Sequence, residues 1–206
     1  MSLLTQFNHT LVQVQVHVPL VLFLIGIVWA IQIVNMILGY RLNRLGIFPR
    51  HLFGLSGVIC CPLLHGSINH IFMNSFFFFP LALIVLIKGK LAFWVVTSSI
   101  TVISGMFIWL FGRNAIHVGA SALVVGYWSY SVATAYLTPN MANIAGAILG
   151  MFYFGADLLG SMLPQGKNVS FEGHIAGFIA GGITAYQYSK LYAWLAPSLV
   201  WLLKYA

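Results

Sequence analysis

Long runs of apolar residues, separated by short polar or proline-containing breaks, make up most of the chain. A helix needs about 20 mostly apolar residues to cross a bilayer, and most of these runs have about that length. The pattern therefore predicts an all-α, polytopic membrane protein with a bundle of six transmembrane helices. The expected spans are about 18–38, 68–87, 91–110, 118–136, 142–162 and 173–188.

Two segments do not fit this alternation. Residues 39–66 contain three arginines, two prolines and several glycines, so this segment is too polar and too broken to span. It is also too apolar for a free loop, and we expect a structured loop that is partly embedded in the membrane. Residues 191–206 carry tryptophan, tyrosine and lysine around Pro197, which predicts an interfacial tail.

Composition strengthens the membrane assignment. Hydrophobic residues make up 61% of the 206 positions and charged residues only 5%, whereas soluble domains carry about 25% charged residues. We expect one membrane domain over 1–206, in contact with the lipid bilayer. The net charge of +7 does not indicate nucleic-acid binding, because the basic residues stand at segment ends rather than in one patch.

Polar side chains inside apolar spans are costly, so each is a candidate for function or for pairing. The second span begins with "HGSINHIFMN", which contains His65, His70 and Asn74. His70 and Asn74 are four residues apart and share one helix face. Two such donors could stabilise an oxyanion, or they could form a polar packing ladder between helices.

The sixth span contains "GHIAGFIAGG", in which Gly173, Gly177 and Gly181 recur every four residues. Such a stripe lets another helix approach closely. His174 borders this face, where it can act as a structural hydrogen-bond donor or as a base.

Ser121 lies in "HVGASALVVG", behind Gly119 and Ala120. A serine hydroxyl is a weak nucleophile and needs an adjacent base. The chain has only two acidic residues, Asp157 and Glu172, and neither is required for a dyad. The simplest arrangement has Ser121 as nucleophile and His174 as general base. His70, Asn74 and the backbone N–H of Ser121 would then form the oxyanion hole.

These motifs together resemble the rhomboid family of intramembrane serine proteases. "GASA" at 119–122 resembles the family's GxSx nucleophile motif, and His174, Gly177 and Gly181 fit its HxxGxxxG pattern. "NHIFMN" ends in the H-x-x-x-N of the second span. The likeness extends over roughly 46–182.

The resemblance implies a six-helix bundle with a short central fourth helix and a water-filled cavity. It implies acyl transfer by Ser121 and His174 without a metal or other cofactor, on single-pass transmembrane protein substrates. His65 would support the first loop, and Gly119 would let the preceding loop curve over the site. The location implied is the inner membrane of a bacterial cell, with the N-terminus cytoplasmic.

Two departures from the family pattern stand out. Ala122 follows the serine where glycine is commoner, and the first loop lacks a Trp-Arg motif, since Arg50 is followed by His51. The basic residues do not support the implied orientation either: four would lie inside and five outside.

Two other functions are open on the sequence. An inactive rhomboid-like protein would bind transmembrane helices without cutting them. A metal or haem protein would use His65, His70, His117 and His174, although their spacing is poor for ligands on one helix face.

Overall fold

The computed structural model describes residues 3–139, 141–155, 159–160 and 171–205. This part of the chain is helical, and its only β-type pairing is an isolated bridge between Ile47 and His117. The longer helices are α1 (Leu3–Ile37), α3 (Ile68–Leu86), α4 (Lys90–Phe111), α5 (Ser121–Leu137), α6 (Met141–Gly150) and α8 (Phe171–Tyr205). The short turns are η1 (Arg41–Leu45), η2 (Leu52–Leu55), α2 (Gly57–Cys60), η3 (Cys61–Leu63) and the π-helical η4 (Met151–Gly155). The all-α prediction is therefore confirmed.

Three helices in the described residues are long and apolar enough to cross a membrane. They are Thr10–Ile37 within α1, Ile68–Leu86 and Lys90–Phe111, and they match the first three predicted spans. Helix α1 begins earlier than the apolar run because the polar residues before it, such as Gln13 and Gln15, are compatible with a helix.

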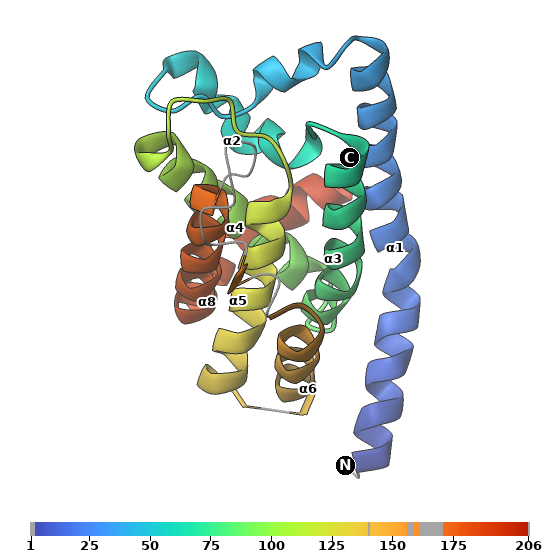
Figure 1. Ribbon diagram of the computed structural model, residues 1–206. Helices are drawn as coiled ribbons and strands as arrows, with labels where there is room; N and C mark the ends of the chain where they lie inside the picture. Colours follow the sequence, from blue (N-terminus) through green and yellow to red (C-terminus); the bar gives the residue numbers. More distant parts are fainter. Residues whose placement is uncertain (1–2, 140, 156–158, 161–170, 206) are drawn as a thin grey trace.

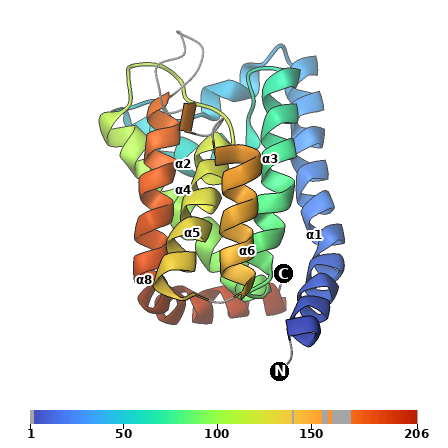
Figure 2. The same cartoon turned by 60° about the horizontal axis from the view of Figure 1, so that its bottom comes forward.

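Helix α5 lies at the centre of the bundle, with α8, α4, α6 and α3 packed around it (Figures 1 and 2). Its aromatic side chains Tyr127, Trp128 and Tyr130 are buried, and they share the core with Leu81 of α3 and Phe93 of α4. Helix α1 packs along α3 and extends beyond the other helices at its N-terminal end (Figure 1).

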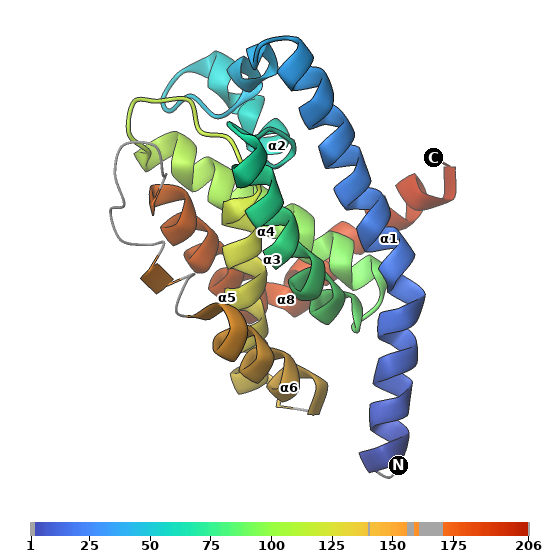
Figure 3. The same ribbon diagram turned by 45° about the vertical axis from the view of Figure 1, so that its right-hand side comes forward.

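The segment between α1 and α3 is a structured loop over one end of the bundle (Figure 3). Backbone hydrogen bonds of the bridge, 3.0 and 2.8 Å long, join Ile47 to His117. Arg50 donates through Nη1 to the carbonyls of Gly112 at 2.8 Å and Leu110 at 3.3 Å. Trp109 Nε1 donates to the His51 carbonyl at 2.9 Å. The loop is thus fixed to the C-terminal end of α4.

Helix α8 continues past residue 188 to Tyr205, with Pro197 inside it. Its last part turns away and passes behind the bundle toward α1 (Figures 1 and 3), where Leu199 lies near Leu24 of α1 and Thr101 of α4. A proline keeps a helical φ and removes one backbone hydrogen bond, so a helix can pass through it with a bend. The predicted span 142–162 falls partly on residues outside those that the structure describes, as does Asp157.

Candidate active site

Ser121 is the first residue of α5, and the two residues before it form a sharp turn. Gly119 has φ +123°, a backbone conformation that favours glycine. Ala120 is the N-cap, and its carbonyl accepts the first helical hydrogen bond, from Val124 N–H at 3.0 Å. The N–H of Ser121 belongs to the first turn, where backbone donors have no partner within the helix. The half-buried Ser121 therefore stands at a helix start with a backbone donor beside its hydroxyl.

The side chains of His70 and Asn74, both on α3, face the turn at Gly119. A Cβ built on Gly119 would lie 2.6 Å from Cε1 and 2.7 Å from Nε2 of His70, and 3.5 Å from Nδ2 of Asn74. Ser67 caps α3 by accepting from the His70 backbone N–H at 3.1 Å. The cap fixes the start of the helix, and the four-residue spacing then brings both side chains to Gly119.

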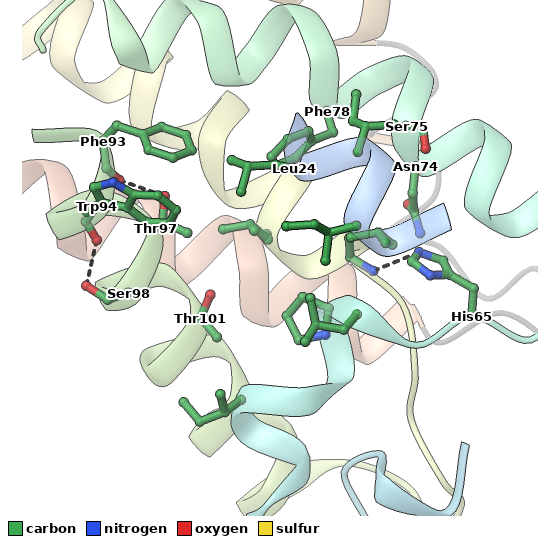
Figure 4. Close-up of a pocket in the computed structure, with 18 of the residues that line it drawn as sticks. Leu24, His65, Asn74, Ser75, Phe78, Phe93, Trp94, Thr97, Ser98 and Thr101 are labelled. Atoms are coloured by element: carbon green, nitrogen blue, oxygen red, sulfur yellow. Dashed lines mark hydrogen bonds between the residues drawn. The ribbon is translucent and has the colours of Figure 1, made fainter. Parts of the chain in front are cut away.

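His65 supports the turn from the loop before α3. It is fully buried, and its Nε2 accepts from the Ala120 backbone N–H at 3.4 Å (Figure 4). Burial lowers the pKa of His65 to about 3, and the neighbouring His70 adds to the effect, so the imidazole is neutral at physiological pH. Cys61 adds a second tether, because its carbonyl accepts from Gly119 N–H at 3.0 Å.

The glycine stripe of α8 packs directly on the backbone of α5. A Cβ on Gly177 would overlap the carbonyl group of Ala122, and one on Gly181 would overlap the carbonyl oxygen of Gly126. This is the close approach that the glycine spacing predicts. His174 is buried one turn before Gly177, and Ser121 directly precedes Ala122. The serine and the histidine therefore lie at the same end of the α5–α8 contact.

The imidazoles of His70 and His174 are near enough to interact electrostatically. The rings of His65 and His70 meet edge to face with centroids 5.1 Å apart. The structure thus gathers at one end of the bundle the residues that the three motifs singled out: Ser121, His174, His70, Asn74, His65, Gly119, Gly177 and Gly181.

Glu172 and Arg113 form a contact that the sequence did not predict. Arg113 Nε lies 3.5 Å from Glu172 Oε1, which joins the loop before α5 to the first turn of α8. An acid in a first turn also stabilises the helix dipole. His117 is buried beside this pair, and burial lowers the pKa of its ring. The signal available in the sequence was the scarcity of acids, since Glu172 is one of only two.

No group of three or more His, Cys, Asp or Glu side chains able to hold a metal ion occurs in the described part of the chain. His117, one of the four histidines in the metal hypothesis, instead pairs its Nε2 with the Arg113 carbonyl at 3.1 Å. The arrangement around Ser121 is one of a hydroxyl, imidazoles and hydrogen-bond donors.

Comparisons with known proteins identify the family of the chain. The family model described as Rhomboid domain matches residues 52–191, which is more than half of the chain and includes every one of the motif residues. The chain therefore belongs to the rhomboid family, and with its apolar helices it is a membrane protein.

The chain is 29% identical over 174 residues to Uncharacterized protein Mb1372 of Mycobacterium bovis and to Uncharacterized protein Rv1337 of Mycobacterium tuberculosis. Each alignment covers 81% of this chain and 72% of the relative. A protein of Mycobacterium leprae, Uncharacterized protein ML1171, is 25% identical over 174 residues, which are 81% of this chain and 69% of that protein. No solved structure gives a significant match.

Proposed function

We propose that this protein is an intramembrane serine protease that cleaves single-pass transmembrane proteins by acyl transfer. The observation that carries the proposal is the turn at Gly119, which faces His70 and Asn74 on one side and leads directly into Ser121. Family membership supports the same reaction, because rhomboid proteins are generally intramembrane serine proteases.

In the proposed reaction, Ser121 Oγ attacks the scissile carbonyl while His174 takes the hydroxyl proton. The negative charge that develops on the carbonyl oxygen is stabilised by Ser121 N–H, Asn74 Nδ2 and the His70 ring. His174 then gives the proton to the leaving amine, and an acyl-enzyme remains on Ser121. Water, activated by the same histidine, hydrolyses this ester and regenerates the serine.

We further propose six spans in the inner membrane of a bacterium. Beyond the three apolar helices, α5, α6 and the first part of α8 would complete the bundle, since α6 and α8 both pack on the central α5. At 17 residues, α5 is short for a span. A short central helix would set Ser121 below the membrane surface, where a cavity supplies water.

The direct test is cleavage of a fluorescent single-pass substrate by purified protein in liposomes. Ser121→Ala and His174→Ala are expected to abolish cleavage and labelling by a fluorophosphonate probe. Ser131→Ala is the matched control, because that buried hydroxyl bonds only within its own helix, to the Tyr127 carbonyl at 2.8 Å. Equal cleavage by wild type and Ser121→Ala would reject the proposal.

The competing function is a rhomboid-like protein that binds transmembrane helices without cutting them. It predicts that substrates can be crosslinked to the wild-type protein while cleavage and probe labelling are both absent. The intact set of Ser121, His174, His70 and Asn74 favours the protease.

A further inference from the structure

The C-terminal end of α1 is bonded to the structured loop through one residue, Asn35, whose side chain is fully buried. Its backbone carbonyl accepts from the Tyr40 N–H at 2.7 Å, and its Oδ1 accepts from the Leu42 N–H at 3.0 Å. Its Nδ2 donates to Asn43 Oδ1 at 2.9 Å. A polar side chain buried in a membrane helix is costly and therefore a candidate for function. Here both ends of the amide are satisfied by the segment that follows the helix.

The backbone that leaves α1 is strained at the same place. Tyr40 has φ +61°, a left-handed conformation that is unfavourable for a residue with a side chain. Such a conformation persists only where the surrounding contacts hold it. The bonds from Tyr40 and Leu42 to Asn35 supply these contacts. Asn35 therefore fixes the turn by which the chain passes from α1 into the loop over the bundle (Figure 3).

The hydrogen bonds continue from Asn43 to the candidate active site. Asn43 Nδ2 donates to the His65 carbonyl at 3.4 Å, and His65 Nε2 accepts from the Ala120 N–H at 3.4 Å. Ala120 directly precedes Ser121. A series of hydrogen bonds thus joins the end of α1 to the turn before the nucleophile, although these segments are far apart in the sequence.

The orientation of both amides is set by the backbone groups at the ends of this series. The Leu42 N–H can only donate, so the Asn35 atom that faces it is the oxygen. The Asn35 nitrogen then faces Asn43, whose oxygen accepts from it and whose nitrogen is left for the His65 carbonyl. Reversing either amide would bring two donors or two acceptors together. A change of one atom at Asn43 therefore breaks the series at a known bond.

We propose that Asn43, supported by Asn35, is a positioning residue that acts through His65 on the turn before Ser121. The bond from Asn43 holds the backbone of His65, from which the ring reaches the Ala120 N–H. The ring in turn keeps the Ser121 N–H where it would stabilise the oxyanion. The inference rests on the proposed protease function. It concerns kcat rather than substrate binding, because the oxyanion forms only in the transition state.

The first test measures kcat and KM for cleavage of the single-pass substrate in liposomes. Asn43→Asp keeps the size of the side chain and the oxygen that faces Asn35, and it replaces only the group that donates to His65. We expect kcat to fall by roughly 10-fold with KM unchanged, since a displacement of about 1 Å at a reacting centre can cost about 100-fold. Asn43→Ala introduces no charge and should show the same loss.

A double variant separates positioning from a general loss of packing. His65→Leu removes the ring acceptor, so adding Asn43→Ala to it should lower kcat no further. Asn143→Ala is the matched control, because Asn143 Nδ2 donates to the Thr138 carbonyl at 2.8 Å at the end of α5 opposite Ser121. It should lower the melting temperature without changing kcat. Losses that multiply in the double variant, or an equal loss of kcat in Asn143→Ala, would overturn the inference.

Hydrogen exchange resolved to single amides gives a readout that needs no protease activity. The Ala120 N–H should exchange roughly 10-fold faster in Asn43→Asp, as expected for the loss of one ordinary hydrogen bond, while Val124 in the same helix is unchanged. Wild-type protein that neither cleaves nor reacts with fluorophosphonate would reject the protease, and exchange at Ala120 would then decide by itself whether Asn43 holds the turn. Unchanged exchange at Ala120 would refute the role of Asn43 in either case.

Discussion

Gly177→Ala tests whether the site depends on the contact between α5 and α8. The added Cβ would lie 2.8 Å from the carbonyl carbon and 2.9 Å from the Cα of Ala122, and closer still to its oxygen, whereas ordinary contacts begin at 3.4 Å. To bring the added Cβ and the Ala122 carbonyl carbon to 3.4 Å, the two helices must separate by 3.4 − 2.8 = 0.6 Å. The atoms in the way are backbone atoms, so the helices themselves must move apart.

Overpacking of this kind costs about 1–3 kcal/mol of stability. The displacement also moves His174 relative to Ser121, and a shift of about 1 Å at a reacting centre can lower a rate by about 100-fold. We therefore expect Gly177→Ala to lower the melting temperature in detergent and to lower cleavage by roughly 10- to 100-fold.

Gly182→Ala provides the matched control on the same helix. The nearest atom to its added Cβ is Ser129 Oγ at 3.8 Å, so nothing has to move. Alanine is favoured over glycine in a helix by about 0.5–1 kcal/mol, and this variant should be as stable as wild type or more so. If Gly177→Ala matched Gly182→Ala in both melting temperature and cleavage, the reasoning would be refuted.

Three further predictions follow from the contacts around the site. The folded-state pKa of His65 is about 3, below its ordinary 6.5, so between these pH values the folded protein binds fewer protons than the unfolded chain and acid lowers its stability. His65→Gln should therefore make the melting temperature fall less steeply as the pH drops from 6.5 to 3. An unchanged slope would contradict this expectation. A double-mutant cycle of Arg113→Ala and Glu172→Ala, measured by chemical denaturation, should give a coupling free energy of at most about 1 kcal/mol, because the ion pair is partly exposed. A larger coupling would contradict this. Arg50→Ala removes two hydrogen bonds from a guanidinium. Proteolysis of the loop by chymotrypsin, whose site at Phe53 the variant keeps, should become faster while the melting temperature of the bundle changes little. Equal loop cleavage in both proteins would argue against the anchor.

Features that repeat within one helix could be predicted from the sequence. The spacing of Gly177 and Gly181 indicated a close helix contact, and the spacing of His70 and Asn74 indicated a shared face; both are present in the structure. Such features depend only on the 3.6-residue period of the helix.

Contacts between distant segments could not be predicted in this way. The sequence lacks a Trp-Arg motif in the first loop, yet a tryptophan and an arginine do fix that loop. Trp109 comes from the end of α4 and bonds to His51, while the Arg50 backbone N–H donates to the Trp109 carbonyl at 2.9 Å. Arg50 also has φ +60°, a left-handed conformation that only the surrounding contacts can impose on a non-glycine residue. No periodic pattern encodes either fact.

The way the structured loop is attached has a consequence for inactivation by heat. The core of α5 and α8 is held by close backbone contacts. The loop is held by buried side chains, Ile47 and Cys61 among them, and by hydrogen bonds at its edge, two of which are exposed. Regions with exposed hydrogen bonds open at lower free energy than the global unfolding of a domain. His65 and Cys61, which support the turn before Ser121, belong to the segment between α1 and α3. Local opening of this segment should therefore inactivate the site reversibly while the helical bundle remains intact. The free energy of this opening, measured by hydrogen exchange in the loop, should then limit function at a lower temperature than the melting of the bundle.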